Sequence, residues 1–320
     1  MSSSEASRGV RPAALRAGAR LAVLSPASTP NPQQVQRGIE RLEAMGYKPV
    51  LYGHALDRGP LYYAGTREDR LANLHAAFAD PEIEGILCTR GGWGSAELLP
   101  YLDTDLIRAN PKAFIGYSDH TSLHCWLQNE TRLVTFYGPM VAADFSREDG
   151  VEFKSWRNSV EGSDHWAVGN GDGLRGLQAG VTEGVLRGGC LSILTQSLGT
   201  PYAAQADDSV LFLEDIGTKP YQWDRMLLHL RYSGRLETAK GIVFGNMAQC
   251  VTAEEMEFLE RVLLYSLRDF RGPIAIGLRS GHVSAPNVTL PLNVRVRLDV
   301  SDEKKSELIF LEAAVTGQVG

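Results

Sequence analysis

Long hydrophobic runs, basic clusters and paired cysteines are all missing from this chain of 320 residues. No apolar run approaches the roughly 20 residues that span a bilayer, so the sequence predicts no membrane partner. Acidic residues outnumber basic ones, 38 against 32, and no basic block offers a footprint for nucleic acid. The four cysteines are scattered without a C-x-x-C pair, which predicts buried free thiols in a reducing cytosol. We therefore expect a cytoplasmic globular protein that binds neither nucleic acid nor membranes.

The length of the chain predicts two domains, since a single hydrophobic core rarely grows beyond about 250 to 300 residues. Residues 1–20 are rich in Ser, Ala and Arg and predict a flexible N-terminal segment. Residues 21–145 alternate strand-like and helix-like segments, which is typical of a parallel sheet with helices on both faces. Residues 146–173 are polar and glycine-rich and predict a linker. Residues 174–320 then predict a second α/β domain with more antiparallel character.

Two patterns in the second domain predict its local structure. The glycine pair at positions 188–189 predicts a turn between a strand and a helix. The segments NVTLPLNVRVRLDV and SELIFLEAAV alternate with period two, so we expect a terminal antiparallel pair of strands.

The segment FIGYSDHTSLH places Ser118 in the sharp turn between an expected strand and an expected helix. Such a turn exposes a hydroxyl at the rim of the sheet, where backbone amides can stabilise an oxyanion. The match to G-x-S-x-G is incomplete, because His120 stands in place of the second glycine. From this segment alone Ser118 is a nucleophile or a helix N-cap, and the cap is the commoner use of a serine there.

A serine nucleophile needs a base and a group that orients the base. His282 lies in the glycine-flanked loop GLRSGHV after an expected strand, and loops at strand ends often carry catalytic groups. A structural hydrogen bond explains this histidine equally well. Glu214 ends the apolar strand VLFLED, where a carboxylate needs a partner such as an imidazole N–H. Simple solvation of Glu214 and Asp215 is the alternative.

Two further patterns resemble binding sites less closely. His120 and His124 are spaced i, i+4 as in H-E-x-x-H, but Thr121 stands where the glutamate is needed, so no metal site is expected. The turn TRGGWGS (residues 89–95) could bind an anion, but it lacks both the G-x-G-x-x-G spacing and a P-loop lysine. It could equally face an oxyanion formed at Ser118, or simply need glycine for its dihedrals. No cofactor is expected.

The chain resembles the LD-carboxypeptidase family of serine peptidases in the order of segments such as TRGGWGSAELLPYLD, FIGYSDHTSLH, VTFYGPM, LFLEDIGTKPYQWDRMLLHL and GLRSGHVSAPNVTLPLNVRVRLD. This family includes murein tetrapeptide carboxypeptidases and microcin C immunity proteins. The resemblance covers about Leu21 to Val300. It implies an α/β fold class, with an N-terminal doubly wound domain similar to glutamine amidotransferases and flavodoxin, and a C-terminal swivelling β/β/α domain.

The resemblance also implies a site and its chemistry. It implies a Ser–His–Glu triad at Ser118, His282 and Glu214, with the nucleophile in one domain and the other two residues in the second. It implies an oxyanion hole made by the backbone amides of Gly91 and Asp119. The triad would hydrolyse a peptide bond through an acyl-enzyme. If Ser118 is only a cap, the chain would instead be a non-catalytic protein that binds a small ligand.

The implied substrate is murein tetrapeptide, cut before its C-terminal D-alanine in peptidoglycan recycling, with a peptidyl nucleotide antibiotic as the alternative. Arg90 and Trp93 are candidate substrate-binding residues, with Arg90 facing the terminal carboxylate. Two residues depart from the family pattern: Cys190 where an asparagine is common, and His120 where an apolar residue or proline is usual. The resemblance further implies a homodimer.

Overall fold

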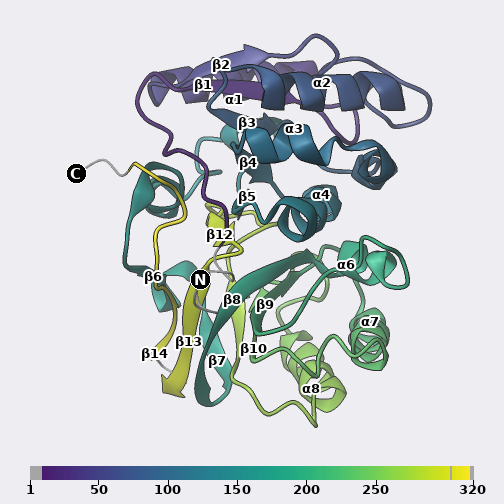
Figure 1. Cartoon of the computed structure of the whole chain (residues 1–320). Helices are drawn as coiled ribbons and strands as arrows, with labels where there is room; N and C mark the ends of the chain where they lie inside the picture. The colour runs from purple at the N-terminus through teal and green to yellow at the C-terminus, as the bar shows by residue number, and fades with distance from the viewer. Residues whose placement is uncertain (1–8, 303–304, 318–320) are drawn as a thin grey trace.

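The computed structural model describes residues 9–302 and 305–317 and consists of two α/β units stacked one above the other (Figure 1). The upper unit is built on a six-stranded sheet and the lower one on an eight-stranded sheet. One hydrophobic core runs through the upper unit and continues onto one face of the lower sheet, and a second core fills the opposite face of the lower sheet.

The first sheet is parallel except for its last edge strand. Its order is β2 (Lys48–Leu51), β1 (Arg20–Leu24), β3 (Gly85–Cys88), β4 (Ala113–Gly116), β5 (Thr135–Tyr137) and β12 (Leu290–Leu292). β3 and β4 are buried at every residue, as expected for short apolar strands covered on both faces. The strand order reverses at β1, so the loops after β1, β3 and β4 open at the point where such sheets bind ligands.

Helices cover both faces of this sheet. One group contains α1 (Pro32–Ala44) and the η4 turn (Val141–Phe145), which pack together. The other contains α2 (Arg67–Ala79), η1 (Ser95–Tyr101), α3 (Thr104–Ala109) and α4 (Thr121–Trp126), followed by η3 (Leu127–Thr131). Right-handed crossovers from this strand order produce these two groups. Local signals start the helices: Asn31 caps α1 ahead of a proline, and Thr66 and Asp69 form a capping box on α2.

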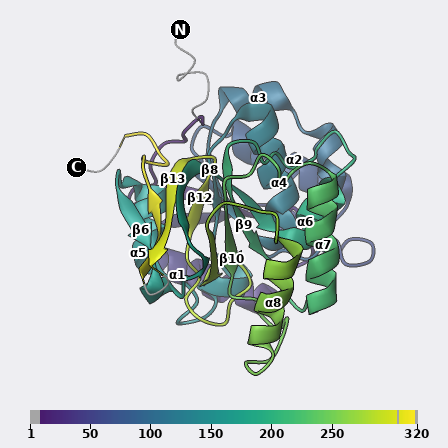
Figure 2. The same ribbon diagram turned by 90° about the horizontal axis from the view of Figure 1, so that it is seen from below.

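The second sheet is parallel at its centre and antiparallel at both sides. Its order is β6 (Trp166–Val168), β14 (Lys305–Phe310), β13 (Arg295–Asp302), β8 (Gly180–Cys190), β9 (Ser209–Glu214), β10 (Gly241–Gly245), β11 (Ile274–Leu278) and β7 (Arg175–Gln178). β7 also lies against β13 and β14, so the sheet folds back into two β layers. A helical layer of α6 (Leu191–Ser197), α7 (Pro220–Tyr232) and α8 (Met256–Ser266) covers one side (Figures 1 and 2).

The alternation of side chains along β9 divides the two cores. Val210 and Phe212 enter the core shared with the upper unit, whereas Leu211 and Leu213 pack beneath the helical layer. The strand therefore buries both faces. Two β layers and one helical layer below a doubly wound sheet confirm the predicted fold class.

Residues 9–20 differ from the predicted flexible segment. Leu15 is fully buried, and Val10 forms a β-bridge with Leu133. The amide of Thr316 donates to the carbonyl of Pro12, which ties the two ends of the described chain together. The buried side chain of Leu15 and these backbone contacts together anchor a segment whose composition is small and polar. Residues 1–8 of the predicted segment lie outside the described residues.

Residues 146–173 form secondary structure instead of the predicted linker. They contain α5 (Phe153–Arg157), η5 (Asn158–Gly162), β6 and η6 (Asn170–Asp172). Trp156 is fully buried, and its indole Nε1 donates to the hydroxyl of Tyr47 at 3.0 Å. Trp156 and Val160, spaced i, i+4, anchor the segment to the upper unit, and a polar composition hides these two apolar positions.

The glycine pair of β8 does not form the predicted turn, because the strand continues through it to Cys190. Gly188 has φ +125°, and a Cβ there would lie 2.0 Å from the carbonyl oxygen of Phe212. The glycines therefore permit close approach of β8 to β9. The predicted terminal pair is present as β13 and β14, but Leu290–Leu292 leaves it and joins the first sheet, antiparallel to β5.

Within residues 9–302 and 305–317, no helix combines the length and the apolar character needed to cross a bilayer.

Candidate active site

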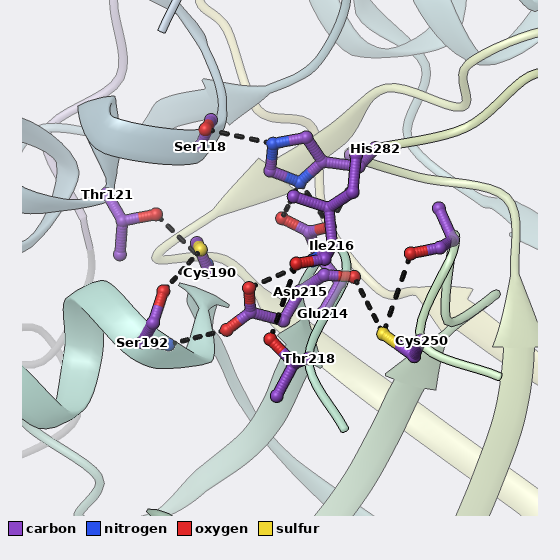
Figure 3. A network of polar contacts seen from close by, with 12 residues as sticks. Ser118, Thr121, Cys190, Ser192, Glu214, Asp215, Ile216, Thr218, Cys250 and His282 are labelled. Carbon is purple, nitrogen blue, oxygen red and sulfur yellow. Dashed lines mark hydrogen bonds and ion pairs between the residues drawn. The ribbon is translucent and has the colours of Figure 1, made fainter. Parts of the chain in front are cut away.

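The side chains of Ser118, His282 and Glu214 form a continuous chain of hydrogen bonds between the two units (Figure 3). Nε2 of His282 lies 2.9 Å from Oγ of Ser118. Nδ1 of His282 lies 2.9 Å from Oε2 and 3.1 Å from Oε1 of Glu214. The structure thus brings together three residues that are separated by up to 164 positions in the sequence.

Ser118 stands at the sharp turn after β4 and opens the short η2 helix (Ser118–His120). Its φ is +65°, a left-handed conformation that is rare for any residue other than glycine. Strain of this kind persists only when the surroundings hold it, and it gathers at functional sites. The half-buried side chain of Ser118 points to His282, and Tyr117, not Ser118, occupies the N-cap position of η2.

Glu214 ends β9 and is almost completely buried. Besides the His282 ring, its carboxylate accepts hydrogen bonds from the backbone amide of His282 at 3.1 Å and from the hydroxyl of Tyr137 at 2.5 Å. Three donors, with the ring N–H shared between the two oxygens, satisfy the demand of this buried carboxylate. Glu214 is therefore buried and hydrogen-bonded to His282, and it is not solvated at the strand end, which was the alternative interpretation of the sequence.

The loop that carries His282 is held by Asn287, which is fully buried. Its amide group accepts from the Gly281 N–H at 3.0 Å and donates to the Gly281 carbonyl at 3.1 Å. Gly281 has φ +88°, and a Cβ there would lie 2.5 Å from Cδ of Glu214. Glycine at this position therefore lets the loop pass directly over the carboxylate. The ring of Tyr117 meets the imidazole edge to face at 5.2 Å.

The positive charge of a protonated His282 and the negative charge of Glu214 stabilise each other. Burial lowers the pKa of His282, but the charge and hydrogen bond of Glu214 outweigh this effect and raise the pKa above its ordinary value of 6.5. Burial raises the pKa of Glu214, but the charge and hydrogen bonds of His282, together with the Tyr137 hydroxyl, hold it below its ordinary value of 4.5. The pair therefore favours an imidazolium next to a carboxylate, which is the state His282 reaches when it accepts a proton.

Sequence reasoning missed Tyr137, which is fully buried at the end of β5. Its hydroxyl donates to Glu214 and accepts a hydrogen bond from the backbone amide of Ser118 at 3.1 Å. The available signal was its place at a strand end next to β4, within the segment VTFYGPM. Asn287 was missed as well, because nothing in its sequence context separates it from an ordinary loop asparagine.

Two backbone amides lie beside the Ser118 hydroxyl. A Cβ on Gly91 would be 2.8 Å from Cβ and 2.9 Å from Oγ of Ser118, and 3.4 Å from the amide nitrogen of Asp119. The Asp119 amide belongs to the first turn of η2, where N–H groups lack partners within the helix. Both predicted oxyanion-hole residues are thus adjacent to the nucleophile position.

The other candidate residues take different positions. Arg90 is exposed, and its guanidinium donates to the carbonyl of Thr29 at 3.4 Å. Trp93 is half-buried, and its backbone amide donates to the Ser28 hydroxyl at 3.1 Å. Among the described residues, no hydrogen bond joins either side chain to Ser118 or His282.

His120 and His124 are both fully buried, and each ring bonds a different backbone carbonyl. Nε2 of His120 lies 3.0 Å from the Arg90 oxygen, and Nε2 of His124 lies 2.9 Å from the Gly116 oxygen. Cys190 pairs with Glu214 across β8 and β9, where burial and the nearby Glu214 and Asp215 charges raise the pKa of its thiol. Nε2 of each histidine is therefore bonded to a backbone carbonyl.

Comparison with known proteins agrees with this geometry. Residues 21–138 match the LD-carboxypeptidase N-terminal domain, and residues 183–298 match the LD-carboxypeptidase C-terminal domain. The chain therefore belongs to the LD-carboxypeptidase family and is a serine-type peptidase.

The similar proteins include both a murein peptide carboxypeptidase and a microcin self-immunity protein. The chain is 36% identical to the probable murein peptide carboxypeptidase of Bacillus subtilis, over 92% of each chain. It is 26% identical to the microcin C7 self-immunity protein MccF of Escherichia coli, over 88% of this chain and 90% of that protein.

Solved structures of both kinds of protein superpose on this chain. An MccF-like protein from Bacillus anthracis superposes with a TM-score of 0.87 at 28% identity, covering 94% of this chain and 99% of the other. A muramoyltetrapeptide carboxypeptidase from Oxalobacter formigenes superposes with a TM-score of 0.79 at 28% identity, covering 91% of this chain and 98% of the other.

Proposed function

We propose that this protein is a serine carboxypeptidase that hydrolyses the L,D-amide bond before the C-terminal D-alanine of murein tetrapeptide. The observation that carries the proposal is the hydrogen-bonded chain from Ser118 through His282 to Glu214. The substrate class rests on the murein peptidase names of similar proteins. Removal of D-alanine from such a peptide is a step of peptidoglycan recycling.

The proposed triad works by general base and nucleophilic catalysis. Nε2 of His282 accepts the proton of the Ser118 hydroxyl as Oγ attacks the amide carbonyl. Glu214 holds Nδ1 as the donor and stabilises the imidazolium that forms. His282 then gives its proton to the leaving D-amino acid. A water molecule, activated by the same imidazole, releases the tripeptide from the acyl-enzyme.

The amides of Gly91 and Asp119 form the proposed oxyanion hole. Each lies next to Ser118, and each such donor contributes on the order of 3 kcal/mol to the stability of the transition state. The exposed Arg90 guanidinium is the proposed partner of the substrate's terminal carboxylate, and Trp93, in the same loop, is proposed to contact the peptide.

An assay of D-alanine release from murein tetrapeptide tests the proposal. The wild-type protein should convert tetrapeptide to tripeptide, whereas Ser118→Ala should lower kcat by several orders of magnitude with little change in folding. Only the wild type should react with a fluorophosphonate probe. Absence of D-alanine release from any L,D-linked peptide would refute the murein substrate, while labelling of Ser118 would still support a serine hydrolase.

The likeness to MccF and MccF-like proteins favours a second candidate, hydrolysis of a peptidyl or aminoacyl nucleotide of the microcin C type. The same triad chemistry would serve this substrate. Parallel assays with the tetrapeptide and with an aminoacyl sulfamoyl adenosine separate the two, because the preferred substrate should show the larger kcat/KM. The higher identity to the murein peptide carboxypeptidase, 36% against 26% for MccF, is our reason for placing the murein peptide first.

The family resemblance further supports a homodimer in the cytoplasm as the working form. Light scattering on the purified protein tests the dimer. A mass close to 35.0 kDa, that of one chain, would contradict it.

A further inference from the structure

His120, which departs from the family pattern, lies directly beneath the loop that carries Gly91. The ring is fully buried, and both of its nitrogens have partners in this loop. Nε2 lies 3.0 Å from the carbonyl oxygen of Arg90, and Nδ1 lies 3.1 Å from the hydroxyl of Ser95. One side chain therefore contacts both ends of the turn that spans residues 90–95.

These partners define the tautomer of His120. A carbonyl oxygen can only accept, so Nε2 must carry the proton, and Nδ1 then accepts from the Ser95 hydroxyl. Burial lowers the pKa of His120 to about 3, so the ring is neutral under ordinary conditions. The imidazole acts here as one fixed donor and one fixed acceptor.

The donor bond constrains the neighbouring amide through peptide geometry. The Arg90 carbonyl and the Gly91 N–H belong to one planar peptide unit, and in a trans peptide they point in opposite directions. A hydrogen bond that holds the Arg90 oxygen toward His120 therefore fixes the direction of the Gly91 N–H. Gly91 lies so close to the nucleophile that a Cβ added to it would be 2.9 Å from Oγ of Ser118.

The loop needs such an anchor because its own backbone is permissive. Gly92 has φ +108° and Gly94 has φ +135°, conformations that glycine samples at low cost. Ser95 is held twice, since its amide donates to Asp119 Oδ2 at 2.8 Å and its hydroxyl contacts His120. The residues that follow the nucleophile thus hold both ends of the loop.

The neighbouring strand leaves room for the imidazole. A Cβ on Gly116 would lie 2.8 Å from Cδ2 of His120, so a side chain at Gly116 would displace the ring. The Phe114 ring also packs against the imidazole edge to face, with the two ring centroids 6.4 Å apart.

We propose that His120 is a positioning residue for the oxyanion hole, which orients the Gly91 amide by holding the Arg90–Gly91 peptide from behind. This role rests on the proposed function, because it presumes that the Gly91 amide receives the oxyanion. His120 does not touch substrate and takes no part in proton transfer.

Three substitutions of His120 separate its two hydrogen bonds. His120→Gln keeps a donor at the position of Nε2, His120→Asn keeps an acceptor at the position of Nδ1, and His120→Leu removes both. We expect His120→Leu and His120→Asn to lower kcat by on the order of 10- to 100-fold with KM within about twofold, and His120→Gln to recover most of the loss. A peptide boronic acid, whose tetrahedral adduct places an oxygen in the hole, should lose affinity in parallel with kcat.

His124→Leu is the matched control. It removes another fully buried imidazole that contacts Phe114 and bonds a backbone carbonyl, but that carbonyl also accepts from the Gly138 amide. Equal losses of kcat in His120→Leu and His124→Leu, or boronate affinity unchanged by His120→Leu, would overturn the positioning role. A wild-type protein that neither releases D-alanine nor reacts with a fluorophosphonate would instead overturn the proposed function, and the positioning role with it.

Discussion

The hydroxyl of Tyr137, in the first sheet, donates a hydrogen bond of 2.5 Å to Oε1 of Glu214, in the second sheet. The same hydroxyl oxygen accepts from the backbone amide of Ser118 at 3.1 Å. One phenol therefore joins the strained backbone of the proposed nucleophile to the carboxylate that orients the proposed base. The two units are connected at the site by this bond as well as by the Ser118–His282 contact.

Tyr137→Phe should weaken catalysis and change its pH dependence. Loss of the phenol removes one donor from Glu214, whose charge then stabilises the His282 imidazolium more strongly and raises the pKa of His282. We expect kcat to fall on the order of tenfold, and the acid limb of kcat/KM to move to higher pH. A steady-state pH profile of both proteins measures this shift.

Tyr47→Phe is the control for this substitution. Tyr47 is also buried, and its hydroxyl accepts from Trp156 Nε1 at 3.0 Å and donates to Glu161 at 3.2 Å, far from Glu214 in the hydrogen-bond network. This variant should lose comparable stability without moving the acid limb. An unchanged limb in Tyr137→Phe would show that the tyrosine is structural only.

Activity should depend on a histidine with a raised pKa. His282 must be neutral to accept the Ser118 proton, and the charge of Glu214 raises its pKa above 6.5 despite burial. We therefore expect kcat/KM to fall as the pH drops through a value above 6.5. Glu214→Gln removes the charge, so besides lowering kcat it should move this limb to lower pH. A limb that stays in place would contradict the assignment of His282 as the titrating base.

The same ion pair predicts how stability varies with pH. The pKa of His282 is raised, so its contribution is complete below 6.5, the unfolded value, and is lost as the pH rises through the folded value. The pKa of Glu214 is lowered, so its contribution is complete above 4.5 and is lost as the pH falls through the folded value. The stability difference between the wild type and His282→Gln, measured by urea unfolding, should be largest between these values and shrink toward alkaline pH.

A methyl group on Gly91 should strongly lower activity without unfolding the protein. Its Cβ would lie 2.8 Å from Cβ of Ser118, so either the loop or the nucleophile must shift by several tenths of an ångström. A displacement of about 1 Å can cost on the order of 100-fold in kcat, and we expect the smaller shift in Gly91→Ala to lower kcat by on the order of 10- to 100-fold. Gly53→Ala, where nothing lies within 4 Å of the new Cβ, should keep full activity. Comparable kcat values for the two variants would argue against close contact at the site.

Alternation of strands and helices predicts much of this arrangement. It places Ser118, Glu214 and His282 at the ends of strands, and parallel strands in one sheet present their ends at one edge. Periodicity carries no information on how two sheets meet. The return of β12 to the first sheet and the burial of Trp156 depend on long-range packing, so the predicted domain limits at residues 145 and 173 differ from the packed structure.

The polar contacts behind the site are beyond sequence reasoning. Tyr137 lies in an apolar strand, where a tyrosine is ordinarily a core residue, and its two hydrogen-bond partners come from different units. The spacing of His120 and His124 suggests only a metal pair that lacks a glutamate, and it gives no sign of a positioning role. The contact of His120 with the Arg90 carbonyl depends on the path of a glycine-rich loop, which residue spacing does not determine.

Thr121 provides a test of how the two units are held together. It is fully buried at the start of α4, and its hydroxyl accepts from the backbone amide of Cys190 in the second sheet at 3.0 Å (Figure 3). Thr121→Val keeps the shape but leaves that buried amide without an acceptor, which should lower the free energy of unfolding by about 1 to 3 kcal/mol. Thr121→Ser keeps the hydroxyl and loses one methyl group, so it should cost about 1 kcal/mol.

Because Glu214 pairs with Cys190 across β8 and β9, misalignment in Thr121→Val should also reduce kcat/KM, whereas Thr121→Ser should retain it. Urea unfolding and steady-state kinetics on both variants measure these effects, and a valine variant as stable and active as the wild type would show that this contact does not align the two units.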